Sequence, residues 1–397
     1  MTGWLSPIIF LIINKEGTLS KIRLTYFIPQ LELGGSERQL LLLVGHLDQT
    51  IFDISIITLV CRIKIPPSIS VHVLPKKVGW DLTFLPRLRS TIRRLKPHIL
   101  HTISTQANIW GLLATLIERP PVVVASVRGR ERGLNRWHYR LARMLYSRLD
   151  RLVVNSPSLA KLAVERFTIH QQRLVIIPNG VDTTKFHPPR SKKEQEVETI
   201  LTPKSSGAIV GWVGNMRQEK GFAQLVKIAG LVAASLPRVK FLVIGKGPDF
   251  FLAHRSVKKA NLTNQFIFTG QVEEVAPYYR AMTLLVNTSL SEGMCSAILE
   301  GMASELPVVT SDIPANRLLV NEGEDGYLVP VNDAEQFAQR IIELLRRPVQ
   351  AHKMGRAGRK KVEKSYSLPG MVTRYAQLYD ELLQERGRRK QWSGNYQ

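Results

Sequence analysis

The sequence predicts an α/β protein built from two doubly wound, Rossmann-like domains in tandem and a C-terminal helix. Short β-branched runs alternate with segments of helical periodicity, which is typical of parallel βαβ units with buried strands. This alternation begins at Lys21–Ile28, stops in the Pro-, Ser-, Lys- and Glu-rich segment 176–207, and then restarts with AIVGWVG. The chain has 397 residues, which suits two domains. Because ligands bind at the carboxyl ends of the strands in such sheets, two facing domains would place the active site in an interdomain cleft.

These patterns divide the chain into five parts. They are an apolar extension (1–20), a first domain (21–185), a linker (186–206), a second domain (207–370) and a C-terminal helix with its tail (371–397). We expect that helix to pack back on the first domain. The apolar run Trp4–Ile13 is shorter than the roughly 20 residues that span a bilayer, and it lacks the flanks of a secretory signal. The extension either dips into a membrane interface or precedes the functional protein.

The charge of the chain is strongly basic and uneven. The formal net charge is +23, with 27 Lys and Arg against 11 Asp and Glu in residues 1–190, and 28 against 21 in the remainder. The basic first half indicates an anionic partner, either nucleic acid, a membrane surface or a phosphate-bearing substrate; the alternative is that the charge serves solubility alone. Two cysteines, Cys61 and Cys295, provide no disulfide framework or metal-ligand spacing, which indicates a reducing, cytoplasmic setting.

Two loops that follow predicted strands have features of phosphate sites. The Gly34-Gly35 turn lets backbone approach a ligand in front of a helix N-terminus, although a tight turn with no ligand explains it equally well. The loop Val213–Gly221 places Arg217 and Lys220 where a strand gives way to a helix. Two cations and nearby backbone N–H groups would clamp a diphosphate, and a solvated basic loop is the alternative.

The segment Ser291–Glu300 carries two acids, Glu292 and Glu300, eight residues apart. This spacing is a little over two helical turns, so both carboxylates can share one side of the element. Carboxylates accept hydrogen bonds from vicinal hydroxyls, as a sugar presents them, and the helix start at Met294–Ala297 offers free N–H groups to a phosphate. The set fits a nucleotide sugar; a pair of exposed helix acids is the alternative.

The motifs occur in an order that resembles the retaining family 4 glycosyltransferases of GT-B fold, also described as group 1 glycosyltransferases. The resemblance covers roughly residues 21–385, and the ordered set is more specific than any one member. The motifs are GGSER, HTISTQANIWGLLA, NSPSLAKLA, PNGVDTTKF, VGNMRQEKG, FLVIGKGP, FTGQVEEVAPYY and SLSEGMCSAILEGMASELPVV.

The resemblance implies roles for individual residues. Glu292 would contact the donor sugar, Glu300 the ribose hydroxyls, and Lys220 with Arg217 the donor diphosphate. His101 is a further catalytic candidate at a strand end, with a buried structural histidine as the alternative. The remaining implied donor-binding residues are Gly35, Gly214, Asn215, Gly270, Gly293, Met294, Cys295 and Ser296.

Three positions depart from the family pattern. Ile103 stands where the family commonly has a second histidine, Leu318 replaces the glutamate of a Gly-Gly-x-x-Glu stretch, and Glu305 replaces a glycine. The first two bear on catalysis and keep an inactive, scaffold-like homologue open as an alternative. A nucleotide-sugar epimerase of the same architecture is another alternative.

The segment Ser126–Arg151 contains eight arginines, and apolar residues recur in it at helical spacing. A basic amphipathic helix suggests docking on anionic lipid, while the alternative is an ordinary domain helix whose Leu141 and Leu145 lie in the core. The arginines are not interleaved with stacking aromatics, so no nucleic-acid partner is expected. We expect acceptor or membrane contacts from Arg128, Arg130, Arg136 and Arg140.

The resemblance therefore implies a retaining transferase. It would move sugar from a UDP-, GDP- or ADP-sugar to a hydroxyl of a saccharide or lipid-linked acceptor, in cell-envelope, lipopolysaccharide or exopolysaccharide biosynthesis. The resemblance implies that the leaving diphosphate helps to take the acceptor proton. We expect no cofactor and no metal, because cations hold the diphosphate, and a cytoplasmic location with peripheral contact to the inner face of the membrane.

Overall fold

The structure, a computed structural model, describes residues 12–13, 19–32, 34–77, 81, 83–129, 135–190 and 207–394. Most of the predicted extension and linker, and also Arg130, lie outside these ranges. Within them, none of the helices combines the length and apolar character needed to cross a bilayer. The chain divides into two compact units: unit 1 comprises Met1–Asn179 and Pro369–Gln397, and unit 2 comprises Gly180–Leu368. The division falls between Asn179 and Gly180, a few residues before the predicted end of the first domain.

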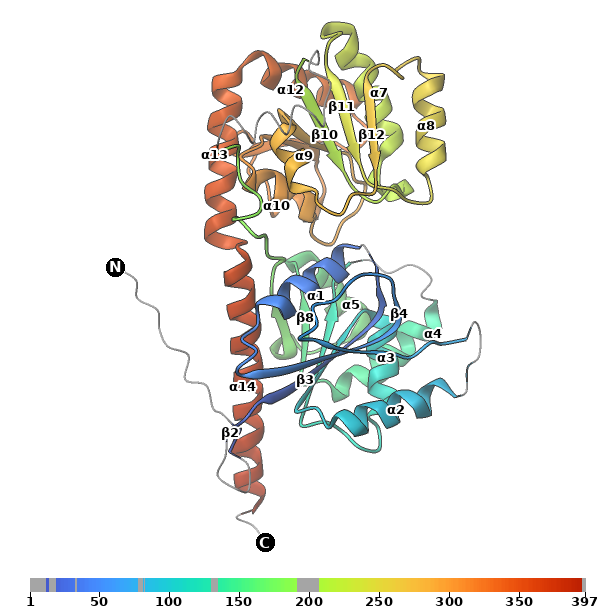
Figure 1. The fold of residues 1–397 in the computed structure, drawn as a ribbon, viewed down its shortest axis with the longest axis vertical. Coiled ribbons are helices and arrows are strands. Elements are labelled where there is room, and N and C mark those ends of the chain that lie inside the picture. Colours follow the sequence, from blue (N-terminus) through green and yellow to red (C-terminus); the bar gives the residue numbers. More distant parts are fainter. Residues whose placement is uncertain are drawn as a thin grey trace, which may run out of the picture. The chain divides into compact units, whose positions relative to one another are not determined.

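Seven strands of the described chain form the parallel sheet of unit 1 (Figure 1), and a short antiparallel hairpin of β1 (Ile12–Ile13) and β2 (Leu19–Ser20) precedes it. The strand order is β5-β4-β3-β6-β7-β8-β9, which reverses direction around the β3–β6 pair as in other doubly wound sheets. The strands are β3 (Ile22–Leu31), β4 (Phe52–Cys61), β5 (Ser70–Val73), β6 (Ile99–Ile103), β7 (Val122–Val127), β8 (Arg151–Val154) and β9 (Leu174–Ile176).

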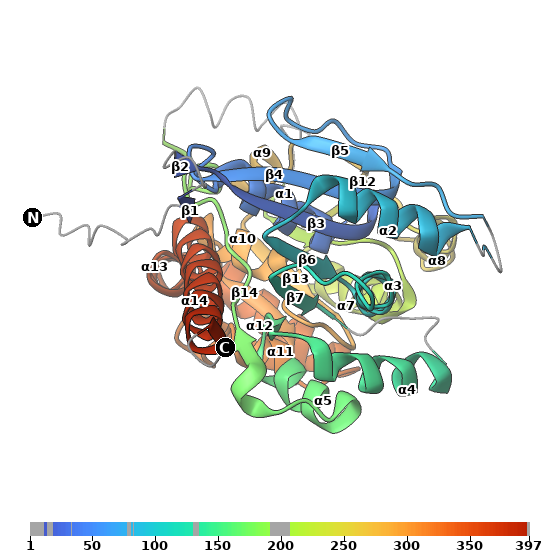
Figure 2. The same ribbon diagram turned by 90° about the horizontal axis from the view of Figure 1, so that it is seen from below.

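Helices cover both faces of this sheet, and Figure 2 shows α3 and α14 on opposite sides of it. On one face, Phe27 and Leu100 of the sheet pack with Phe84 of α2. On the other, Tyr26 of β3 meets Tyr379 of the C-terminal helix, and their hydroxyl oxygens are 2.8 Å apart. The helices are α1 (Gly35–His46), α2 (Phe84–Leu95), α3 (Thr105–Ala114), α4 (Arg136–Leu145), α5 (Pro157–Phe167) and α14 (Leu368–Gly394), with 3-10 turns η1 (Tyr146–Arg148) and η2 (Gln171–Arg173).

Unit 2 is built on a six-stranded parallel sheet of order β12-β11-β10-β13-β14-β15, counted over its described residues. Its strands are β10 (Ile209–Val213), β11 (Lys240–Ile244), β12 (Phe266–Gly270), β13 (Leu284–Asn287), β14 (Val308–Ser311) and β15 (Gly326–Val329). Its helices are α7 (Phe222–Ser235), α8 (Phe250–Lys259), α9 (Ala276–Ala281), α10 (Ser296–Ala303), α11 (Pro314–Arg317), α12 (Ala334–Arg346) and α13 (Pro348–Ser365), and η3 (Gln218–Lys220) precedes α7.

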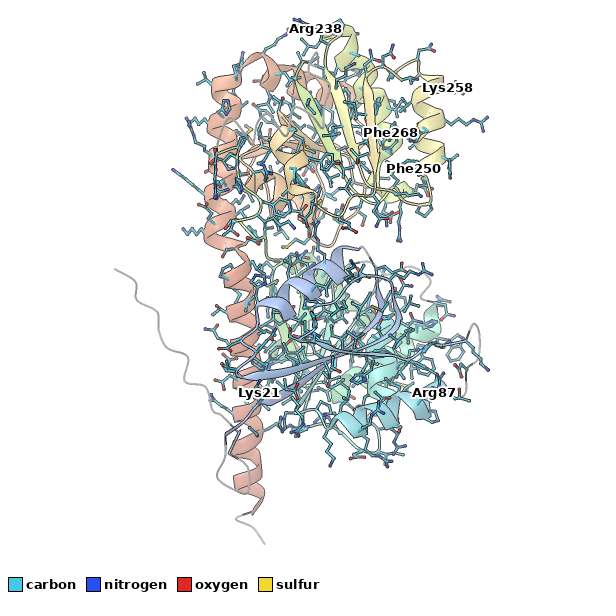
Figure 3. All side chains as sticks on the ribbon, viewed as in Figure 1. Lys21, Arg87, Arg238, Phe250, Lys258 and Phe268 are labelled. Atoms are coloured by element: carbon cyan, nitrogen blue, oxygen red, sulfur yellow. The ribbon has the colours of Figure 1, made fainter. Side chains whose placement is uncertain are left out.

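Two apolar layers hold the helices of unit 2 to its sheet. Helices α7, α8 and α12 share one core with Trp212 and Phe241, and α9 and α10 share the other with Leu242 and Leu285. Phe250 of α8 and Phe268 of β12, both labelled in Figure 3, lie with ring centroids 6.2 Å apart and join that helix to the sheet edge. The predicted fold of two doubly wound α/β sheets with flanking helices is confirmed.

Candidate functional site

The centre of the candidate site lies where two neighbouring strands of unit 2 end. Strands β10 and β13 are paired, and each leads into a loop that carries a predicted residue. Lys220 Nζ lies 2.5 Å from Glu292 Oε1, and the Ser289 hydroxyl donates to the same oxygen at 2.7 Å. The Lys220 and Glu292 side chains are 21 % and 12 % exposed, so the pair is shielded and still open to a ligand. The structure thus joins two residues that the sequence suggested separately.

Hydrogen bonds between the two loops fix this pair. The Thr288 hydroxyl donates to the Lys220 carbonyl at 2.9 Å, and Trp212 Nε1 donates to the same hydroxyl at 3.2 Å. The Leu290 N–H donates to the Glu219 carbonyl at 2.7 Å. Lys220 therefore approaches Glu292 because its backbone is tied to the strand that leads to Glu292.

Electrostatics at the pair favour a charged lysine and a neutral thiol. Burial is the largest single effect and acts to lower the pKa of Lys220, but the charge and hydrogen bond of Glu292 together with its other acidic neighbours outweigh burial and hold the pKa above its ordinary value. The neighbouring Cys295 is 3 % exposed, and burial and then the Glu292 charge raise the pKa of its thiol to about 12. Cys295 is consequently a protonated helix-start residue and no thiolate nucleophile.

The other predicted cation, Arg217, is not part of this ion pair, although its carbonyl accepts a hydrogen bond from the Lys220 N–H at 2.9 Å. It caps the start of η3, its side chain is exposed, and it makes no ion pair within the described part of the chain. Asn215 is also exposed. A ligand phosphate could reach Arg217 without displacing a protein carboxylate, whereas Lys220 already has Glu292 as a partner.

The glycines that follow β11 allow the loops at the ends of β10, β11 and β12 to pack closely. A β-carbon on Gly245, whose φ is +125°, would lie 2.1 Å from the Gly214 carbonyl oxygen, and one on Gly247 would lie 2.2 Å from Asn215 Oδ1. The Gly245 N–H donates to the carbonyl of Gly270, which has a φ of +69°. Gly245 and Gly247 were not among the predicted site residues; the sequence signal for them is the Gly-Lys-Gly that directly follows the apolar run of β11.

Helix α10 begins at Ser296, four residues after Glu292. Cys295 is its N-cap, and Gly293 and Met294 are buried just before it, while Ser296 is half-buried. The first N–H groups of a helix can receive an anion. Glu300, in the next turn, is 6 % exposed and accepts a hydrogen bond from the Tyr279 hydroxyl at 2.9 Å. The two acids therefore have different partners: Glu292 faces Lys220, and Glu300 faces Tyr279 of α9.

His101 lies in the interior of unit 1. Its side chain is fully buried, its Nδ1 is 2.7 Å from the Tyr379 hydroxyl, and its Nε2 is 2.7 Å from the Ser126 hydroxyl. Burial, followed by the charge of Arg128, lowers the pKa of His101 to about 3. Both ring nitrogens have hydrogen-bond partners, which matches the structural alternative given above for this histidine.

Gly35 is the exposed first residue of α1, and neither it nor Gly34 has a positive φ.

The predicted arginines occupy two different settings. Arg128 is anchored, because its guanidinium donates to the Tyr375 hydroxyl at 2.8 Å and to Asn179 at 3.3 Å. Arg136 and Arg140 are exposed on α4, where Arg140 lies 5.4 Å above the ring of Trp137. The apolar residues of this segment have different environments. Leu141 and Leu145 pack in the core of unit 1, in agreement with the alternative of an ordinary domain helix, and Trp137 is 72 % exposed.

The positions that depart from the family pattern have structural consequences. Ile103 ends β6 and is 2 % exposed. Leu318 caps α11, and its carbonyl accepts a hydrogen bond from the Tyr366 hydroxyl. Glu305 has a φ of +60°, a left-handed conformation that glycine adopts at low cost, so the glycine usual at this place has a conformational reason. Among the described residues, no group of three His, Cys, Asp or Glu side chains is placed to hold a metal ion.

Comparison with known families identifies both halves of the chain. Residues 33–185 match the sequence model of "Glycosyltransferase Family 4", and residues 207–347 match that of "Glycosyl transferases group 1". The two matches lie in unit 1 and unit 2 apart from a few residues at the boundary, so both loops of the candidate site fall within the second match.

Individual relatives cover most of the chain at low identity. It is 24 % identical to the UDP-Gal:alpha-D-GlcNAc-diphosphoundecaprenol alpha-1,3-galactosyltransferase of Escherichia coli, over 76 % of this chain and 80 % of that protein. It is 23 % identical to the capsular polysaccharide biosynthesis glycosyltransferase CapM of Staphylococcus aureus, over 79 % of this chain and 86 % of that protein. The crystal structure of Anabaena HepE in complex with UDP is similar in fold, with a TM-score of 0.76, 17 % identity, and coverage of 91 % of this chain and 100 % of that one.

Proposed function

Because the chain belongs to the family 4, group 1 type glycosyltransferases of GT-B fold, we propose that it transfers a sugar from a nucleoside-diphosphate sugar with retention at the anomeric carbon. The observation that carries this proposal is the Lys220–Glu292 pair at the ends of β10 and β13. A carboxylate that can accept sugar hydroxyls and a cation that can meet a diphosphate lie within one hydrogen bond of each other, beside the start of α10.

In the proposed reaction, the bond between the anomeric carbon and the diphosphate oxygen breaks, and the bond from the acceptor oxygen to that carbon forms on the same face. The acceptor proton passes to an oxygen of the leaving diphosphate. Lys220 and Arg217, with the N–H groups at the start of α10, stabilise the negative charge that develops on the diphosphate. Glu292 positions the donor sugar and Glu300 the ribose. Neither Cys295 nor His101 transfers a proton in this reaction. We propose that the cations neutralise the leaving diphosphate without the help of a metal ion.

A UDP-sugar is the donor that the comparisons favour, because the E. coli relative is named for UDP-Gal and the HepE structure holds UDP. GDP- and ADP-sugars are the alternatives. The same E. coli relative is named for a diphosphoundecaprenol acceptor and the S. aureus relative for capsular polysaccharide. We therefore propose a lipid-linked saccharide acceptor and a role in cell-envelope polysaccharide synthesis.

A lipid-linked acceptor lies in a membrane. We propose that α4 contributes to docking of the protein on the cytoplasmic face of that membrane. Its exposed residues include Arg136, Arg140 and Arg143 together with Trp137 and Met144, which are 72 % and 73 % exposed. Basic and large apolar side chains on one exposed helix suit an anionic lipid surface. Flotation with anionic liposomes at low salt tests this, and protein that stays unbound there contradicts it.

The experiment that tests the transfer proposal combines binding with turnover. A thermal-shift screen of UDP-, GDP- and ADP-sugars should identify a stabilising nucleotide, and the sugar nucleotide that binds is then incubated with lipid-linked acceptor. Glu292→Gln should retain the fold and lose transfer. Full activity of this variant would refute the role of Glu292. Isomerisation of the sugar nucleotide without acceptor would instead indicate an epimerase, and a protein that binds none of the three would indicate an inactive scaffold.

A further inference from the structure

A basic pocket lies at the amino-terminal ends of strands β3, β6 and β7. The carboxyl end of β6, at Ile103, is at the opposite edge of the sheet. Its volume is about 210 Å³, which is room for several water molecules at roughly 30 Å³ each. It opens between the C-terminal turn of α2, the end of α3 and the segment before β7. Its lining residues are Arg23, Arg89, Ile92, Arg93, Lys96, Pro97, His98, Ala114, Glu118, Arg119, Pro120 and Pro121.

Cations outnumber acids in this lining, five to one, and two of the cations are already committed. Arg119 donates to the Asp150 carboxylate at 2.6 Å. Arg23 donates to the Lys96 carbonyl at 2.7 Å, and its terminal nitrogen lies 3.0 Å from His98 Nε2. Burial and then the charge of Arg23 lower the pKa of His98 to about 4, so this histidine is neutral near pH 7. It neither adds to nor offsets the positive charge.

The other three cations have no carboxylate partner within the described residues. Arg89, Arg93 and Lys96 lie along the C-terminal end of α2, where Arg89 and Arg93 are four residues apart and hence on the same side of the helix. The carbonyl groups at a helix C-terminus favour one or two nearby cations. They do not account for Arg89, which precedes the last turn, and two like charges at this spacing repel each other. Glu118 is the single acid in the lining.

We propose that this pocket binds a phosphate-class anion. Guanidinium groups match phosphate oxygens in pairs of parallel hydrogen bonds, so Arg89 and Arg93 can hold one phosphoryl group from one side while Lys96 supplies a third cation. The ligand is either a soluble phosphate or diphosphate, or the phosphoryl headgroup of an anionic lipid. The pocket shares no lining residue with the proposed diphosphate site of Lys220 and Arg217. The proposal therefore stands independently of the proposed transferase chemistry.

The test uses the imidazole of His98 as a reporter inside the pocket. The full-length protein is labelled at histidine, the His98 signal is assigned with His98→Gln, and inorganic phosphate or diphosphate is titrated while the imidazole carbon–proton resonances are followed. We expect saturable shifts of the His98 signal. Arg93→Gln should weaken the apparent affinity about tenfold, as expected for loss of a charged hydrogen-bonding partner. Arg94→Gln, the neighbouring arginine outside the lining, should leave it unchanged.

Vesicles distinguish the two sources of the phosphoryl group. If the natural ligand is a lipid headgroup, phosphatidic acid vesicles should shift or broaden the His98 signal in wild type and Arg94→Gln but not in Arg93→Gln, and phosphatidylcholine vesicles should have no effect. A response to phosphate without a response to these vesicles assigns a soluble ligand. The proposal is overturned if none of the anions perturbs His98, or if Arg93→Gln and Arg94→Gln weaken binding equally, since the effect would then be general attraction to a basic surface.

Discussion

Gly221 lies against the carbonyl of Thr288 so closely that a β-carbon at this position would be 2.0 Å from the carbonyl oxygen. Gly221 also has a φ of +65°, in the left-handed region that costs other residues about 1–2 kcal/mol. It directly follows Lys220, whose carbonyl accepts a hydrogen bond from the Thr288 hydroxyl. The close packing of these two loops, which brings Lys220 to Glu292, therefore depends on the missing side chain.

We predict that Gly221→Ala destabilises unit 2 by roughly 2 kcal/mol or more, since it adds a steric clash to the left-handed cost. The clash should also displace Lys220 and weaken sugar-nucleotide binding. Gly230→Ala is the matched control, because Gly230 lies within α7 and a β-carbon there would approach a methyl carbon of Leu262 no closer than 3.9 Å. That change should be neutral or stabilising, because alanine favours helices. Urea denaturation and calorimetric titration measure both effects, and equal stability of the two variants would contradict the prediction.

A second prediction concerns the coupling between Lys220 and Glu292. Because both side chains are largely shielded, either Lys220→Met or Glu292→Gln leaves a poorly solvated partner, and the double variant should lose less stability than the sum of the single changes. We expect a coupling free energy of about 1 kcal/mol in a double-mutant cycle. The Glu343–Arg347 pair of unit 2, in which Arg347 is 65 % exposed, serves as control and should show less than about 0.5 kcal/mol. Additive effects at Lys220 and Glu292 would show that their contact contributes no stability.

The sequence allowed the two-sheet fold to be predicted, because buried parallel strands and the helices between them leave local patterns. It also placed Lys220 and Glu292 in loops after strands. Their contact could not be predicted from those patterns. The two residues lie 72 positions apart, and they meet because β13 pairs with β10 even though β11 and β12 intervene in sequence.

The burial and hydrogen-bond partners of individual residues could not be predicted from local sequence patterns either. The apolar spacing around α4 left open whether the helix faces lipid or the core. Leu145 is buried and Trp137 is exposed, because contacts with α3 and α5 decide which turn is covered. His101 appeared both as a catalytic candidate and as a structural residue, and its surroundings depend on Tyr379, which is 278 residues away. Such distant partners leave no trace in the spacing of nearby residues.

The buried His101 should make unit 1 sensitive to acid. Its pKa is about 3 in the folded protein, against about 6.5 for an exposed histidine. Between these values the unfolded chain binds a proton that folded His101 does not, so the contribution of neutral His101 is complete above pH 6.5 and declines as the pH falls toward 3. In the steep part of this range the free energy of unfolding should fall by about 1.4 kcal/mol per pH unit.

Urea denaturation between pH 7 and pH 4 measures this slope. His101→Gln removes one titrating group and should reduce the slope by up to about 1.4 kcal/mol per pH unit, even if it lowers stability at pH 7. The part of the slope due to His98, whose pKa is also lowered, to about 4, should remain. His170→Gln changes an exposed histidine of the same unit and should keep the wild-type slope. If His101→Gln retains the full slope, other groups are responsible for the acid sensitivity.

The last prediction concerns the hydroxyl of Tyr379, which ties α14 to the sheet of unit 1. It lies 2.8 Å from the Tyr26 hydroxyl and 2.7 Å from His101 Nδ1, and all three side chains are at most 1 % exposed. Burial raises the pKa of both tyrosines, so they act as neutral donors and acceptors. Tyr379→Phe leaves two buried polar atoms without this partner and should cost about 1–3 kcal/mol.

Tyr26→Phe combined with Tyr379→Phe should cost less than the sum of the single changes, because one substitution removes the group that the other leaves unpaired. Tyr278→Phe is the control, since the Tyr278 hydroxyl makes no hydrogen bond within the described residues and its loss should change stability by less than about 0.5 kcal/mol. Chemical denaturation of the four variants measures these differences. A loss for Tyr379→Phe no larger than that for Tyr278→Phe would show that the Tyr379 hydroxyl contributes nothing to holding α14 against the sheet of unit 1.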